Sequence, residues 1–108
     1  MQGADVAEQA VDWIERYLLL YESPPCAREK AGQFFAAHSD YADEFRRRRP
    51  GVLLMIGPFP EPEEGQPGAM SIFTSSEAAE EFAIADPFVV NGVVEKWRIR
   101  LWLVSGKD

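Results

Sequence analysis

"VLLMIGPFPEPEEGQPGAMSIFT", residues 52–74, contains two short apolar runs separated by a stretch rich in proline and glycine. The runs at 52–57 and 69–74, bounded by glycine and proline, are typical of strands. The residues between them, 57–68, hold four prolines and three glycines and predict a surface loop. With two successive strands in the middle of the chain, the fold depends on the elements on either side.

On the N-terminal side, a strand and a long helix are expected. "RYLLLYE", residues 16–22, is an apolar run that ends at three turn-forming residues, 23–25, and favours a buried strand. The helix is predicted over about 26–48, because Pro50 and Gly51 then end it. Its apolar stripe consists of Ala27, Ala31, Phe34, Phe35, His38, Ala42 and Phe45.

On the C-terminal side, a second helix and a final strand are expected. Thr74 and Glu77 form a capping-box pattern that opens the helix. Ala78, Phe82 and Ala85 are expected on its inner face, and Glu80 and Glu81 on its outer face. "VVEKWRIRLWLV", residues 93–104, alternates as a strand does. One face carries Val93, Trp97, Ile99, Leu101 and Leu103, and the other carries Lys96, Arg98 and Arg100.

The resulting order, β-α-β-β-α-β, is typical of an α+β fold of the ferredoxin-like kind, an antiparallel sheet with helices on one face. This domain is expected over residues 16–104, followed by a C-terminal tail at 105–108. Asp5 and Glu8 form a further capping box, so a short helix is predicted over residues 5–15, within an N-terminal helical extension of residues 1–15. Its apolar residues recur at helical spacing: Val6, Ala10, Trp13, Ile14 and Tyr17.

The uncovered face of such a sheet is the expected contact with a partner. Trp102 and Val104 fall on the same side of the last strand as its basic residues. A sheet face that mixes apolar and basic side chains commonly closes against a second subunit. The sequence therefore predicts a homodimer in which two sheets meet.

Composition limits the classes of function. The chain has 108 residues, enough for one domain, and a formal net charge of −7. The negative charge argues against a nucleic-acid partner, since phosphate binding needs a basic surface. No apolar run reaches the roughly 20 residues of a membrane helix, and no leader pattern opens the chain. We expect a cytoplasmic protein without a membrane partner.

Cys26 and the run Arg46–Arg49 each have two interpretations. A single cysteine excludes an internal disulfide and a multi-cysteine zinc site. Cys26 is then either a structural residue or a reactive thiol near a helix start. The arginine run lies at a predicted helix C-terminus, where cations suit the dipole. It is either a solvated helix end or a site for an anion or a partner.

His38 is the only histidine in the chain. It shares the apolar stripe of the long helix with Phe34 and Ala42 and is therefore expected to face the sheet. One interpretation is a partly buried histidine that bonds a backbone carbonyl. The other is a general acid/base, because histidine ordinarily titrates closest to neutral pH.

Asp86 also has a structural and a chemical interpretation. Pro87 disfavours helical geometry at Asp86, so the second helix must end there. The pair Asp86–Pro87 then suits the start of a new helical turn, which Asn91 and Gly92 can end. Alternatively, the carboxylate accepts from one nitrogen of His38 and leaves the other nitrogen free for a substrate proton.

Several of these residues resemble those of a known family. "GPFP" (57–60), the long segment "SSEAAEEFAIADPFVVNGVVEKWRIRLW" (75–102) and His38 on an upstream helix are similar to YCII-related (YciI-like) proteins. The resemblance implies a dimeric α+β barrel built on the ferredoxin-like fold, with a paired histidine and aspartate that map onto His38 and Asp86. Gly57 and Pro58 match the family's turn near the pocket. Phe88 and Gly92 match the segment after the aspartate.

The resemblance implies a reaction class but also has departures. One relation in the family is a dehydrochlorinase that acts on a chlorinated hydroxyhydroquinone. Family members often carry an arginine shortly before the histidine and a leucine just after it, where this chain has Phe34, Phe35 and Ser39. If that arginine binds an anion, the substrate here differs or the site is degenerate.

With the resemblance included, the prediction is proton transfer by His38 and Asp86 on a small cyclic or aromatic oxygenated compound, by isomerisation or elimination, without a cofactor. The expected substrate-binding residues are Gly57, Pro58, Phe59, Phe88, Phe35 and Tyr17. The alternative is a non-catalytic ligand-binding or interaction module on the same barrel. Haem binding by His38 is a further class, and a metal site is disfavoured because one histidine and scattered acids make a poor ligand set.

Overall fold

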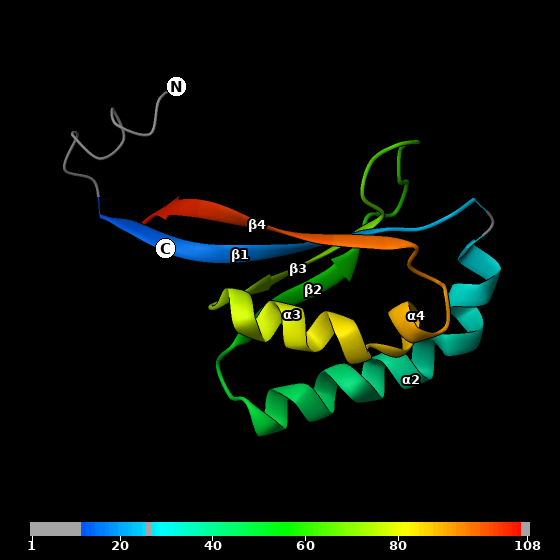
Figure 1. Cartoon of the computed structure of the whole chain (residues 1–108), viewed down its shortest axis with the longest axis horizontal. Coiled ribbons are helices and arrows are strands. Elements are labelled where there is room, and N and C mark those ends of the chain that lie inside the picture. The colour runs from blue at the N-terminus through cyan, green and yellow to red at the C-terminus, as the bar shows by residue number, and fades with distance from the viewer. Residues whose placement is uncertain (1–11, 26, 107–108) are drawn as a thin grey trace.

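The computed structural model of the chain describes residues 12–25 and 27–106 (Figure 1). Its elements follow in the order β1 (Trp13–Glu22), α2 (Ala27–Arg48), β2 (Leu53–Pro58), β3 (Ala69–Phe73), α3 (Ser76–Ala85), α4 (Pro87–Val90) and β4 (Lys96–Ser105). The two central strands, β2 and β3, enclose the loop expected at 57–68 and confirm the interpretation of residues 52–74. Apart from the short α4, the order is the predicted β-α-β-β-α-β.

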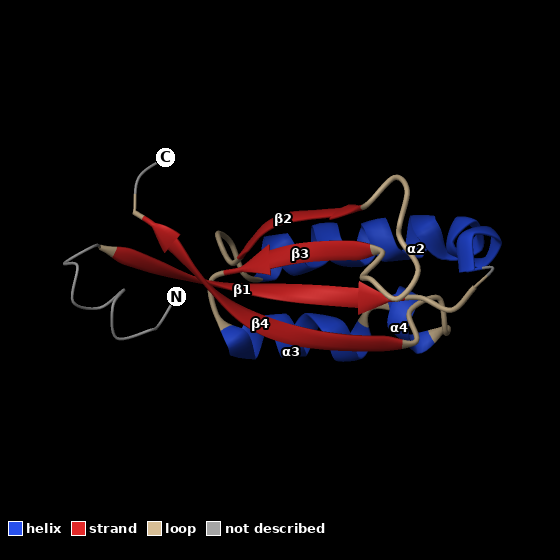
Figure 2. Ribbon diagram, turned by 90° about the horizontal axis from the view of Figure 1, so that it is seen from above, coloured by secondary structure: helices blue, strands red, loops and turns tan. Residues whose placement is uncertain are grey.

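The sheet has the strand order β2-β3-β1-β4, and every neighbouring pair is antiparallel. β1 and β2 therefore run parallel to one another, and β3 is inserted between them, as in a split βαβ unit. The helices cover one face of the sheet, with α2 under β2 and β3 and α3 under β1 and β4 (Figure 2). The fold is α+β and consistent with the ferredoxin-like class.

An aromatic cluster fills the space between the helices and the sheet. Phe45 of α2, Phe73 of β3 and Phe82 of α3 are all fully buried. The ring of Phe45 meets that of Phe82 edge to face, with centroids 5.2 Å apart and an interplanar angle of 86°. Small side chains let α3 approach the sheet closely, since Ala78, Ala79 and Ala83 are also fully buried. Ala85, predicted on this inner face, is exposed instead.

The start of β1 corrects the predicted N-terminal helix. β1 begins at Trp13 and pairs with β4 along its whole length, from Trp13 opposite Ser105 to Glu22 opposite Lys96. The helix predicted over 5–15 therefore does not extend over residues 13–15, because strand pairing prevails over the helical spacing there. Residues 1–11 and Cys26 lie outside the described residues, so the rest of that helix and the interpretation of Cys26 stay predictions.

The helix after β3 also begins one residue later than the capping-box pattern indicated. Ser75, not Thr74, is the N-cap of α3, and its side chain accepts from the backbone N–H of Ala78 at 3.1 Å. The backbone N–H of Thr74 instead donates to the carbonyl of Val52 at 3.0 Å, which ties this residue to the strand side of the turn.

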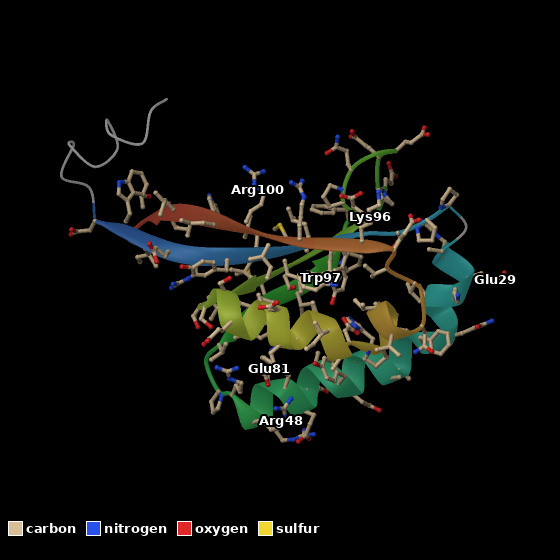
Figure 3. All side chains as sticks on the ribbon, in the orientation of Figure 1. Glu29, Arg48, Glu81, Lys96, Trp97 and Arg100 are labelled. Atoms are coloured by element: carbon tan, nitrogen blue, oxygen red, sulfur yellow. The ribbon has the colours of Figure 1, made fainter. Side chains whose placement is uncertain are left out.

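Within the described chain, no helix covers the other face of the sheet, and the 59–67 loop covers it only in part, at Leu20. Arg100 points away from the helices, whereas Trp97, on the other face of β4, points toward them (Figure 3). Trp102 shares the outer face with Arg100 and has 46% of its surface exposed. None of the described helices is long and apolar enough to cross a membrane.

Candidate active site

Asp86 sits at the junction of two helices. The backbone N–H of Asp86 bonds the carbonyl of Phe82, which ends α3, and Asp86 is then the N-cap of α4 with Pro87 in the first position. Its backbone is extended (φ −62°, ψ 127°), the geometry that a following proline favours. Gly92, at φ 78°, ends the turn in the left-handed region. The predicted sequence of stop, cap and turn is confirmed.

The carboxylate of Asp86 is completely buried and accepts from three donors. Oδ1 lies 3.0 Å from the backbone N of Phe88 and 2.8 Å from Nδ1 of His38. Oδ2 accepts from the hydroxyl of Tyr21 at 2.6 Å. An ionised carboxylate only accepts hydrogen bonds, so Nδ1 must carry the hydrogen in the pair with His38. Capping and the contact with His38 therefore coexist on one carboxylate.

His38 connects this buried carboxylate to the surface. Its ring stacks on Phe88, with centroids 4.0 Å apart and an interplanar angle of 7°. Only 12% of the side chain is exposed. With Nδ1 donating to Asp86, the nitrogen left to accept is Nε2, on the other side of the imidazole. The arrangement holds the imidazole in one orientation and one tautomer, which is what a general base requires.

A cavity of about 460 Å³ opens beside His38, between α2 and the strands β2 and β3. This volume lies within the range of pockets that bind small molecules. Its lining is largely apolar and aromatic, with a few polar groups among them. The lining residues are Tyr21, Ala31, Phe35, His38, Ser39, Ala42, Asp43, Arg46, Ile56, Gly57, Pro58, Ala69, Met70, Ser71 and Phe88.

Four of the six residues predicted to bind substrate line this cavity: Phe35, Gly57, Pro58 and Phe88. They come from α2, β2 and α4, which are far apart in the chain. Their role toward a substrate stays a prediction. Asp86 lies behind His38 and does not line the cavity itself.

Tyr17 and Phe59 lie elsewhere. The Tyr17 hydroxyl donates to Glu15 at 3.1 Å, and its ring packs against the core from β1. Phe59 lines a separate hollow of about 290 Å³ formed by the 59–67 loop and Leu20. Both rings are large and suit an apolar pocket, but nothing in the sequence indicates which strand face or which side of the loop they occupy.

Tyr21 contacts Asp86 directly but was not among the residues predicted for the site. Burial, and then the neighbouring Asp86 carboxylate, raise the pKa of its hydroxyl far above the usual value. Tyr21 therefore stays neutral and donates to Asp86 at any ordinary pH. The sequence did contain a signal for this contact. Tyr21 lies in a run predicted as a buried strand, and a buried tyrosine hydroxyl needs a hydrogen-bond partner.

The cavity also contains polar residues that were not predicted to bind substrate. Ser71 is 3% exposed on β3, and Ser39, Asp43 and Arg46 follow His38 along α2. Among residues 12–25 and 27–106, no group of three or more histidine, cysteine, aspartate or glutamate side chains is placed to hold a metal ion.

Comparison with known proteins gives two findings. The model of the YCII-related domain family matches residues 15–103. The fold is similar to that of 5-chloro-2-hydroxyhydroquinone dehydrochlorinase (TftG) from Burkholderia phenoliruptrix AC1100, solved in complex with 2,5-dihydroxybenzoquinone. The TM-score is 0.63 at 19% sequence identity, and the match covers 81% of this chain and 92% of that chain. No significant match is found among curated proteins.

Proposed function

Since this chain belongs to the YCII-related domain family, we propose that it is a small-molecule enzyme that uses His38 and Asp86 for proton transfer. The substrate class is a small cyclic or aromatic oxygenated compound, and the reaction is an isomerisation or an elimination. The observation that carries the proposal is the 2.8 Å contact between His38 Nδ1 and Asp86 Oδ1 at the wall of an apolar cavity.

The proposed mechanism assigns a separate role to each nitrogen of His38. Nδ1 donates to Asp86, which stabilises the imidazolium that forms when Nε2 removes a proton from the substrate. In an elimination, the electron pair of the broken bond moves into the ring and expels the leaving group as an anion. The imidazolium then releases its proton to solvent. In an isomerisation, it returns the proton to another atom of the same substrate.

Tyr21 and Phe88 support this role from outside the reacting centre. The Tyr21 hydroxyl and the Phe88 amide hold the carboxylate in place, and the Phe88 ring holds the imidazole from one face. Both are positioning residues. The dehydrochlorinase neighbour acts on a chlorinated hydroxyhydroquinone. We take that compound class as the starting point for substrates of this chain.

The proposal includes a homodimer formed through the open sheet face. The acidic loop residues Glu61, Glu63 and Glu64 and the basic residues of β4 offer opposite charges to a second copy. The same face carries exposed apolar side chains, among them Trp102 next to Arg100 on β4. In a two-fold arrangement each copy would present both charges to the other.

A non-catalytic ligand-binding module is the second candidate. It is favoured by the apolar lining of the cavity, which suits a ring compound whether or not a reaction follows. The two candidates share the binding step and differ in the need for the dyad. Replacing His38 would abolish the function of the enzyme but not the binding of the module.

Turnover of 5-chloro-2-hydroxyhydroquinone tests the proposal. We expect chloride release by the wild-type protein, and a loss of roughly 10²- to 10⁴-fold in His38→Gln and Asp86→Asn. Asp40→Asn, an exposed aspartate on the same helix, is the matched control and should keep the rate. Binding of 2,5-dihydroxybenzoquinone without any turnover would instead favour the binding module.

A further inference from the structure

Arg46 occupies the same face of α2 as His38. His38, Ala42 and Arg46 follow one another at intervals of four residues, and all three line the cavity. Residues at this spacing lie one above another along a helix. The rise of the helix separates the Cα atoms of His38 and Arg46 by about 12 Å along its axis. Both side chains line the same cavity, so a ligand in it lies within reach of each.

The other arginines of the run are engaged with carboxylates. Arg47 pairs with Glu44 at 2.6 Å on the exposed side of α2. Arg48 and Arg49 both pair with Glu81 of α3, Arg48 at 3.6 Å. These three ion pairs give Arg47, Arg48 and Arg49 a structural role, on the surface of α2 and in its contact with α3. For these residues, the interpretation as a helix end is sufficient.

Arg46 differs from its neighbours in this respect. Its Nε makes a long contact, 3.5 Å, with the carbonyl oxygen of Leu53. Within the described parts of the chain, no carboxylate lies within 4.0 Å of its guanidinium nitrogens. Asp43 also lines the cavity, but it forms no ion pair with Arg46. Arg16, Arg28, Arg98 and Arg100 also have no carboxylate within 4.0 Å in the described parts of the chain, but of these five arginines only Arg46 lines the cavity.

The cavity lining therefore holds two different chemical groups along α2. The imidazole of His38 lies stacked on the ring of Phe88, and Arg46, about two turns further along the helix, offers guanidinium donors. Guanidinium groups bind carboxylates and similar planar anions through paired, charge-assisted hydrogen bonds. A neutral ring compound would leave this capacity unused.

We infer that Arg46 binds an anionic group of the substrate, a carboxylate or an ionised ring hydroxyl, while His38 faces the carbon or oxygen that loses its proton. The inference rests on the proposed function and narrows it to acidic ring compounds. In this arrangement Arg46 determines substrate specificity, and His38 carries out the proton transfer. One member of the arginine run thus acts at a binding site, and the other three belong to the helix surface.

The test compares two ligands of the same size, 2,5-dihydroxybenzoate and its neutral counterpart 2,5-dihydroxybenzamide. Dissociation constants are measured by calorimetry for the wild type, Arg46→Gln, Arg46→Lys and the control Arg47→Gln. We expect the wild type and the control to bind the benzoate at least about tenfold more tightly than the amide. Arg46→Gln should remove this preference, and Arg46→Lys should keep part of it, because it retains the charge but not the fork of donors.

The outcomes separate the inference from the proposed function. If the wild type binds both compounds equally, or if Arg46→Gln keeps the preference, the inference is overturned and the proposed function stands. If the wild type binds neither compound, the cavity is not a site for oxygenated ring compounds, and both the inference and the proposed function are contradicted. Loss of the preference in Arg46→Gln alone, with unchanged binding of the amide, supports the inference.

Discussion

At the scale of single residues, Asp86 joins local structure to chemistry. The sequence raised capping and contact with His38 as alternatives, and the structure has both on the same oxygen, Oδ1. The cap could be predicted because Asp86 and Pro87 are adjacent in the chain. The partner Tyr21 is 65 residues away, and only the packing of β1 against the end of α3 brings it to Oδ2.

Replacement of Asp86 should change the tautomer of His38. In the wild type the carboxylate requires the hydrogen on Nδ1, whereas Asp86→Asn removes the charged acceptor and should let the imidazole sample both tautomers. Nitrogen NMR detects this directly, because His38 is the only histidine. Asp40→Asn serves as the control and should leave the spectrum unchanged. A wild-type imidazole with its hydrogen on Nε2 would contradict the proposed arrangement.

Tyr21→Phe should lower the free energy of unfolding by about 1–3 kcal/mol, since it leaves a buried carboxylate oxygen without its donor. Tyr17→Phe, which removes an exposed hydroxyl, is the matched control and should change stability by less than about 0.5 kcal/mol. Urea unfolding of the two variants at neutral pH measures the difference. Equal losses in both would contradict the role given to Tyr21.

The raised pKa of Tyr21 also predicts a dependence of stability on pH. Above the usual tyrosine pKa of 10.0, the unfolded chain loses this proton while the folded protein keeps it. The free energy of unfolding should therefore fall as the pH rises past about 10. Tyr41, whose pKa burial and Asp86 raise to about 12, adds to the same trend. Unfolding measured from pH 8 to 11 should show a smaller slope in Tyr21→Phe than in the wild type.

At the scale of elements, the sequence correctly predicted the helices and strands whose apolar pattern can be recognised within a short window. The long helix α2 and the strands β2 and β3 lie within one or two residues of the expected ranges. The predicted start of β1 was wrong, because the spacing of Trp13, Ile14 and Tyr17 fits a helix as well as a strand. Only pairing with β4, more than 80 residues later in the chain, decides between the two, and such pairing cannot be seen in a short window.

Two glycines offer a matched test of the helix geometry. Gly92 ends α4 at φ 78°, and a Cβ there would lie 3.2 Å from Nζ of Lys30, so Gly92→Ala should destabilise the protein by about 1–2 kcal/mol. Gly32 lies within α2 with nothing near its added Cβ, so Gly32→Ala should stabilise it by about 0.5–1 kcal/mol. Thermal unfolding should move in opposite directions, and a shift of the same sign in both would contradict this account of α4.

At the scale of the whole molecule, the two sides of the sheet differ in what they carry. The helical side carries the cavity, and the outer side of the sheet carries Trp102 among basic residues, with the acidic loop 57–68 beside it. The family match confirms the resemblance read from the residues. The homodimer remains our proposal, because a sheet face shows what it can bury but not what covers it.

Trp102→Glu should convert the proposed dimer into a monomer by replacing an exposed apolar side chain of the proposed contact with a charge. Ile84→Glu is the matched control, because Ile84 is 62% exposed on α3 and lies outside the sheet. Light scattering at micromolar concentration should give a dimer mass for the wild type and the control and a monomer mass for Trp102→Glu. A monomeric wild-type protein would contradict the proposed contact.

Proton exchange tests the central claim most directly, because both candidate reactions begin with removal of a proton by His38. The measurement follows the ring hydrogens of 2-hydroxyhydroquinone by proton NMR in D₂O, with oxygen excluded. The wild-type protein should accelerate their replacement by deuterium, and His38→Gln and Asp86→Asn should reduce that acceleration by roughly 10²- to 10⁴-fold. No acceleration by the wild type, or equal acceleration by His38→Gln, would contradict proton transfer by the dyad.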